Sequence, residues 1–167
     1  MKRATIVISA AVMAAGFTSC GKSEAKPQEL EKNFTCDAVI VQDETEYCAE
    51  LERIDGAGWH AVFTAPETIE GLEVSLLNDK CTVSFGELTY TSDRGDLPQY
   101  GMLELVTCAA DSCILGKAQK TRPQGEKFVR TGTVRDCAYS AEISGKRLES
   151  IEISDDITVL FSNYSDK

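Results

Sequence analysis

The stretch DLPQYGMLELVTCAA, residues 96–110, decides the fold, because it is the one convincing helix in the sequence. Asp96 suits the N-cap position and Pro98 suits the first turn. Apolar side chains then recur at helical spacing and form a broad stripe, with Glu104 on the opposite face. We therefore predict an amphipathic helix over about residues 97–110, whose apolar face needs a sheet to cover it.

On both sides of this helix, short runs of alternating apolar residues are separated by turn residues, which is typical of antiparallel strands. A phase change at Gly86 predicts a β-bulge within one of them. No long helical stretch lies between the strands, so parallel βαβ units are excluded. The sequence predicts the α+β class, as a strongly bent antiparallel sheet of about nine strands with the helix on its concave face, like a half-barrel. The expected strands cover residues 34–40, 47–51, 59–63, 74–76, 81–90, 128–134, 137–143, 151–153 and 157–161.

The first hairpin has a register that its own side chains specify. Cross-strand neighbours share one face of a sheet, so apolar residues should lie opposite apolar residues. A turn at Gln42–Asp43 would place Phe34 opposite Leu51 and Ala38 opposite Tyr47. We expect this register, because shifting it by one residue would set apolar side chains against glutamates.

The beginning of the chain is typical of a secretory signal peptide. A basic start, Met1–Arg3, precedes an apolar run, Ala4–Phe17, that is shorter than the roughly 20 residues a membrane-spanning helix needs. The segment Phe17-Thr18-Ser19-Cys20 resembles the lipobox of bacterial lipoproteins. The resemblance implies transfer of a diacylglycerol to the Cys20 thiol and cleavage directly before it. It also implies a lipid-anchored location on the extracytoplasmic face of the bacterial cell membrane.

Three segments follow from this layout. Residues 1–19 are the expected signal peptide, and residues 20–32 comprise the lipidated cysteine and a polar tether without strand or helix periodicity. Residues 33–167 are long enough for a single domain with its own core.

The net charge of the chain limits the classes of partner that it can bind. The formal net charge is −10, which disfavours nucleic acid and anionic headgroups as partners of the whole surface. Residues 117–135 depart from this trend, since six Lys and Arg residues accompany a single acid, Glu126. This window is either a solvated loop and strand, or a patch that faces the anionic membrane or an acidic ligand group.

Four short motifs carry a second resemblance, which spans most of residues 33–164. The segments resemble those of a group of small uncharacterised lipoproteins from Gram-positive bacteria. The order of the elements is also similar to the half-barrel of bacterial lipoprotein carriers and related lipid-binding lipoproteins. The resemblance implies this fold far more than a function, since its motifs are structural and mark no binding residue. The motifs are residues 66–72, 83–88, 96–98 and 159–164.

Residue types that support catalysis are scarce. His60 is the only histidine, and its alternation with Trp59 and Ala61 turns it away from the core. The sequence contains no nucleophile elbow, no Gly-rich phosphate loop and no Cys-x-x-Cys pair. We expect a protein that is not an enzyme and that uses no metal or other cofactor.

Six cysteines follow Cys20, and two interpretations of them stay open. An even number outside the cytoplasm favours disulfides, whereas their placement on apolar strand faces favours reduced core thiols. Cys108 and Cys113 could be joined only if the helix ended between them. The six are Cys36, Cys48, Cys81, Cys108, Cys113 and Cys137.

Two functions remain after these exclusions. The first is a carrier or binding module for a lipid or another apolar molecule, with a cavity between the sheet and the helix. The second is a cell-surface domain that binds or modulates an envelope protein without any ligand cavity, with Glu46 and Glu50 of the acidic first hairpin on the contact face. The residues expected to line the cavity are Trp59, Phe63, Phe85, Met102, Leu103 and Val106.

Overall fold

The computed structural model describes residues 29–96 and 101–166, which form one antiparallel sheet and one α-helix. The expected signal peptide, the lipobox with Cys20 and most of the tether lie outside these residues. No helix in the described ranges is long and apolar enough to cross a membrane. The strands are β1 (Phe34–Gln42), β2 (Thr45–Ile54), β3 (Gly58–Ala65), β4 (Glu73–Leu77), β5 (Lys80–Phe85), β6 (Leu88–Asp93), β7 (Lys120–Gln124), β8 (Lys127–Val134), β9 (Cys137–Ser144), β10 (Arg147–Ile153) and β11 (Ile157–Asp166).

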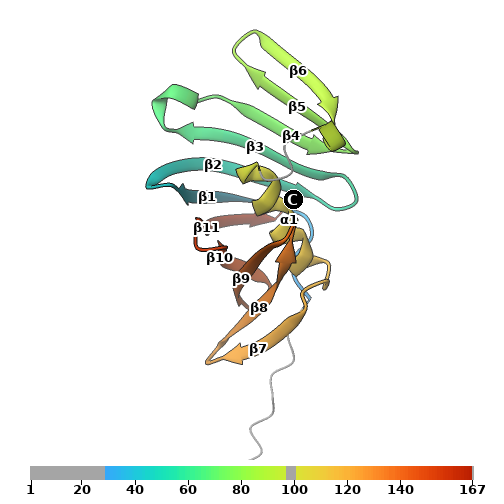
Figure 1. Ribbon diagram of the computed structural model, residues 1–167, viewed down its shortest axis with the longest axis vertical. Helices are drawn as coiled ribbons and strands as arrows, with labels where there is room; N and C mark the ends of the chain where they lie inside the picture. Colours follow the sequence, from blue (N-terminus) through green and yellow to red (C-terminus); the bar gives the residue numbers. More distant parts are fainter. Residues whose placement is uncertain (1–28, 97–100, 167) are drawn as a thin grey trace, which may run out of the picture.

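The sheet consists of two meanders joined at its centre. Its strand order is β6-β5-β4-β3-β2-β1-β11-β10-β9-β8-β7, so the first and last strands pair with each other and β6 and β7 form the two edges (Figure 1). The described chain thus runs outward to one edge, crosses to the other edge, and returns to the centre. The strands do not close into a barrel.

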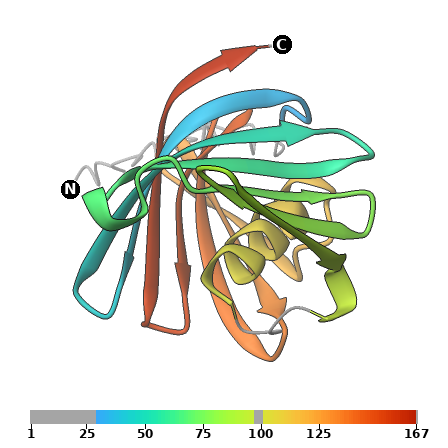
Figure 2. The ribbon, with the colours of Figure 1, turned by 90° about the horizontal axis from the view of Figure 1, so that it is seen from above.

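The helix α1 (Met102–Ile114) lies in this crossing connection, on the concave face of the bent sheet (Figure 2). Our prediction placed the helix too early and ended it too soon. Asp96 ends the 3-10 helix η2 (Arg94–Asp96), and the N-cap of α1 is Gly101. Pro98 lies outside the described residues. Packing extends α1 beyond the predicted end, because Ile114 in its last turn is buried against the sheet.

The core fills the space between α1 and the concave face. Inward-facing residues of the central strands supply most of it, as their alternation predicted. Phe34 and Trp59 meet edge to face with ring centroids 5.8 Å apart. From α1, Leu105, Val106 and Ala109 are buried against the sheet.

The described residues form eleven strands where we expected nine, and the difference lies at the two edges of the sheet. Residues 81–90 form two strands rather than one. Gly86, with φ of +59°, begins the two-residue turn between β5 and β6, so our prediction of a bulge there was wrong. The strand that we missed, β7, is exposed along its whole length and contains Pro123. Neither edge strand has a buried face, and β7 has no apolar alternation from which it could be predicted.

The first hairpin has the predicted faces but a different register. Its two turn residues are Asp43 and Glu44, both with positive φ, and not Gln42–Asp43. Phe34 therefore lies opposite Arg53, and Ala38 lies opposite Ala49. The observed register therefore differs from the predicted one by two residues. A shift by an even number keeps every side chain on its predicted face. The turn has the left-handed backbone of a type I′ hairpin, without the Asn-Gly signal that commonly marks one.

We predict that Gly58→Ala destabilises the protein far more than Gly56→Ala. Both glycines have positive φ, at +135° and +75°, but a methyl group on Gly58 would overlap the carbonyl oxygen of Leu76, whereas Gly56 faces open space. The expected losses in unfolding free energy are about 3 kcal/mol or more at Gly58 and about 1 kcal/mol at Gly56. Urea denaturation measures both, and equal losses would contradict the close packing of β3 on β4.

Candidate functional site

An apolar groove lies on the concave face between the start of α1 and strands β4 and β5. The helix packs on β8, β9 and β10, in the second meander. It leaves part of the concave face of the first meander uncovered, and the groove there has a volume of about 240 Å³. The groove is lined by Val74, Leu76, Cys81, Val83, Gly101, Met102, Leu103 and Glu104.

Strand pairing explains the apolar floor of this groove. Val74 lies directly opposite Val83, and Leu76 lies opposite Cys81, so all four side chains point to the same face. Met102, in the first turn of α1, forms part of the facing wall. Leu76 and Cys81 are buried, and Val74 and Val83 are half-buried, so the groove opens only part of this apolar floor to a ligand or partner.

The apolar surface continues beyond the groove onto the β5–β6 hairpin. Val83 lies opposite Tyr90, and Phe85 lies opposite Leu88, so these side chains share the face of the groove floor. Phe85 is 46% exposed, Tyr90 69% and Leu88 76%. Three large apolar or aromatic side chains therefore face solvent next to the groove.

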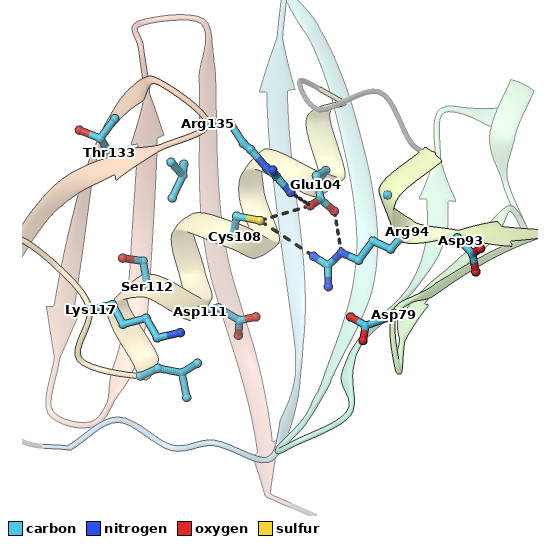
Figure 3. Close-up of a pocket in the computed structure, with 13 residues that line it drawn as sticks. Asp79, Asp93, Arg94, Glu104, Cys108, Asp111, Ser112, Lys117, Thr133 and Arg135 are labelled. Carbon is cyan, nitrogen blue, oxygen red and sulfur yellow. Dashed lines mark hydrogen bonds and ion pairs between the residues drawn. The ribbon is translucent and has the colours of Figure 1, made fainter.

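A polar cleft of about 820 Å³ lies further along α1 (Figure 3). The helix, η2 and the β8–β9 hairpin supply most of its charged side chains. Glu104 lines both this cleft and the apolar groove, so the two spaces meet at this residue. The cleft is lined by Asp79, Asp93, Arg94, Gly95, Glu104, Cys108, Asp111, Ser112, Leu115, Lys117, Thr133, Val134 and Arg135.

Glu104 connects the two meanders through its buried carboxylate. Its Oε2 accepts a hydrogen bond from Nε of Arg94 at 3.0 Å, and its Oε1 accepts one from Nη2 of Arg135 at 3.2 Å. Arg94 belongs to η2, which follows the edge strand β6, and Arg135 lies in the turn between β8 and β9. Our sequence analysis placed Glu104 on the polar face of the helix. In the structure that face of the helix is covered at Glu104, because the guanidinium groups of Arg94 and Arg135 both donate hydrogen bonds to its carboxylate.

A second ion pair anchors α1 to the first meander. Arg53 of β2 is only 4% exposed, and its Nε donates to Oδ1 of Asp111 at 2.9 Å. The same guanidinium donates to the carbonyl of Lys32 and lies 5.9 Å from the centre of the Trp59 ring. The sequence pattern did not reveal this anchor, because Arg53 occupies a position where alternation predicts an apolar residue.

Cys108 lies beside the carboxylate of Glu104 in the cleft. Its Sγ is 3.4 Å from Oε1 of Glu104 and 3.9 Å from Nη2 of Arg94. Burial, followed by the negative charge of Glu104, raises the pKa of the Cys108 thiol. A raised pKa keeps the sulfur protonated near neutral pH, which is unfavourable for a nucleophile.

All six cysteines of the described chain are free thiols. The helix runs through both Cys108 and Cys113, so these two cannot be joined. Burial raises the pKa of Cys36 to about 12 and that of Cys113 to about 11. These two thiols are therefore small apolar members of the core.

The residues predicted to line the cavity separate into three groups. Met102 and Leu103 line the groove. Trp59, Phe63 and Val106 lie in the core, with at most 4% of each exposed. Phe85 lies on the hairpin outside the groove lining. The four strand residues of the floor were missing from our prediction, although their alternation was visible in the sequence.

The other residues singled out from the sequence lie away from the groove. His60 is on β3 with its Nε2 3.6 Å from Oε2 of Glu73. Glu46 and Glu50 are exposed on β2. Of the basic window, Lys117 and Arg135 line the polar cleft. Among the described residues, no group of three or more His, Cys, Asp or Glu side chains could hold a metal ion.

Comparisons with known proteins show the fold alone. No family model matches the chain, and no curated protein matches it. An uncharacterised conserved protein from Thermus thermophilus is similar in structure over 83% of this chain and 81% of that chain, with a TM-score of 0.53 and 11% sequence identity. A LolA superfamily protein from Nitrosomonas europaea matches over 81% of this chain and 84% of that chain, with a TM-score of 0.45 and 10% identity.

We predict that Glu104→Gln destabilises the fold by about 2 kcal/mol, because it leaves the partly buried guanidinium of Arg94 without its carboxylate, while the exposed Arg135 adds little. Glu149→Gln is the matched control, since Glu149 forms an exposed ion pair with Lys127. Its loss should cost less than about 1 kcal/mol. Chemical denaturation of both variants measures the difference, and losses of similar size would show that Glu104 does not connect the two meanders.

Proposed function

We propose that this chain is a lipid-anchored, extracytoplasmic binding or carrier protein for an apolar ligand or lipid. The observation that carries the proposal is the apolar groove that α1 leaves uncovered on the concave face. The proposed anchor is a lipid on Cys20, which the signal-like start of the chain and the Phe17-Thr18-Ser19-Cys20 segment support. The polar tether after Cys20 would hold the domain away from the membrane surface.

The shape and chemistry of the groove suit an alkyl chain. Its floor consists of aliphatic and thiol side chains, and Met102 in its wall is a flexible residue that adapts to ligands of different shape. The exposed Phe85, Leu88 and Tyr90 extend the apolar surface toward the turn of the β5–β6 hairpin. Burial of this surface by a ligand would contribute favourable free energy in proportion to the area covered.

Binding without catalysis is part of the proposal. The thiol beside the polar cleft has a raised pKa. Two acids of the cleft, Glu104 and Asp111, form ion pairs with arginines of the protein itself. Such pairs support structure rather than acid–base chemistry.

A second candidate is a domain that binds another envelope protein. The exposure of Leu88 and Tyr90 beside the edge of the sheet favours it, because exposed apolar patches also mark protein interfaces. The two candidates differ in what occupies the groove. A carrier holds a small apolar molecule there, whereas an interaction domain holds side chains of its partner.

The carrier function predicts that a bulky residue in the groove blocks ligand uptake. Val83→Trp should lower the binding of the fluorescent apolar probe N-phenyl-1-naphthylamine by about ten-fold or more, since it fills a groove of only 240 Å³. Leu160→Trp is the control, because Leu160 is 54% exposed and lies on a strand outside the groove. Probe titration and native mass spectrometry of the detergent-free chain carrying Cys20→Ser measure the outcome. Absence of any bound probe or lipid would favour the interaction domain.

The lipid anchor makes a separate prediction. In the native host, the wild-type chain should sediment with membranes and partition into detergent, because its acyl chains hold it there. The Cys20→Ser chain should lose this membrane association, while Cys48→Ser, which removes a thiol inside the domain, should keep it. A Cys20→Ser chain that still sediments with membranes would contradict the anchor.

A further inference from the structure

We propose that the polar cleft binds the anionic head group of an amphiphile whose single alkyl chain occupies the apolar groove. This inference rests on the proposed carrier function and names the class of its ligand. The ligand class is a single-chain molecule that ends in a carboxylate or phosphate, such as a fatty acid or an alkyl phosphate.

The first argument is that the two spaces adjoin. Glu104 lines both the apolar groove and the polar cleft, and Met102 and Cys108 lie on opposite sides of it along α1. A molecule that lies along this part of α1 would therefore have aliphatic side chains at one end and charged ones at the other. The two volumes, about 240 Å³ and 820 Å³, are unequal. The small apolar part suits one alkyl chain, since sites for drug-sized ligands measure roughly 300–1,000 Å³.

The arginines in the cleft supply oriented donors for an anion. Arg94 and Arg135 converge on the carboxylate of Glu104, as Figure 3 shows. Two guanidinium groups on one carboxylate leave a net positive charge. Each guanidinium has five N–H groups, so donors remain beyond those that contact Glu104. Because Glu104 already holds both side chains in place, an incoming carboxylate or phosphate needs to immobilise less of the protein.

Lys117 adds a third cation that is available to a ligand. It lines the cleft, is exposed, and forms no ion pair with any residue of the described chain. In Figure 3 its side chain extends across the cleft toward Asp111. A flexible ammonium group of this kind suits the binding of a carboxylate or phosphate as a point charge.

The acids of the cleft are mostly neutralised by partners of their own. Asp111 pairs with Arg53, Asp93 pairs with Lys80, and Glu104 is shared by two arginines. Asp79 is the remaining acid of the lining, and it is exposed, so solvent and salt screen its charge. With these partners counted the cleft is close to neutral, and the donors left for a ligand are the Lys117 ammonium and the remaining N–H groups of Arg94 and Arg135.

The test compares alkyl chains of equal length with different head groups. The protein is the full chain carrying Cys20→Ser, which can take no lipid at that position, in detergent-free buffer. Dodecanoate, dodecyl phosphate, dodecanol and dodecyltrimethylammonium, each below its micelle concentration, compete with N-phenyl-1-naphthylamine. The two anions should bind about ten-fold more tightly than the cation, and added salt should reduce this difference.

Lys117→Gln should weaken the binding of both anions about three- to five-fold and leave dodecanol unchanged, because it removes one charge-assisted contact. Lys120→Gln is the matched control. Lys120 belongs to the same basic stretch of sequence, but it lies on β7 and does not line the cleft. Its substitution should leave all four affinities unchanged. An equal effect of both substitutions would show that net charge, rather than the cleft, selects the ligand.

The remaining outcomes separate the two proposals. If all four alkyl compounds bind equally well, the carrier function stands and the head-group site is wrong. If none binds, the carrier function fails, and the head-group site fails with it. Inorganic phosphate alone should bind far more weakly than dodecyl phosphate. Equal affinities for the two would mean that the cleft takes a free anion and that the alkyl chain contributes nothing.

Discussion

The ion pairs of α1 join the two meanders across the concave face, in addition to the β1–β11 pairing that joins them at the centre of the sheet. Glu104 joins η2 of the first meander to the β8–β9 turn of the second, and Asp111 joins α1 to β2. The helix could rest on apolar contacts alone, but such contacts are not directional. Charge-assisted hydrogen bonds fix its position and rotation, so the same part of the first meander stays uncovered. The groove is therefore a consequence of where these charges are placed.

The faces of the strands and the existence of the helix followed from the sequence, because both depend on regular patterns of apolar residues. Trp59 and Val106 were identified as inward-facing in this way, and the structure buries both. The edges of the sheet did not follow, because β6 was joined to β5 as one strand across Gly86, and β7 is exposed along its whole length and lacks alternation. The start of α1 was also misplaced, since Asp96 has the chemistry of an N-cap but is used in a 3-10 turn.

The candidate site was harder to predict than the fold. Apolar residues of a groove and of a core have the same pattern in the sequence, and only the position of α1 separates Met102 from Val106. The polar cleft depends on residues that are distant in sequence, such as Arg94 and Arg135, and no local spacing connects them. Arg53 could not be predicted for the same reason. A buried arginine interrupts the apolar alternation of β2, and its partner Asp111 on α1 is distant in the sequence.

The pairing of β1 with β11 also governs the order in which the molecule can be assembled. These strands are the first and the last of the sheet, yet they are neighbours at its centre. The middle of the sheet must stay open until β11 is available to pair with β1. Each meander can form early from local hairpins, whereas their union requires contacts between residues more than a hundred positions apart, which are slow to form. A chain stopped before β11 would have two half-sheets with exposed central strands, a state prone to aggregation.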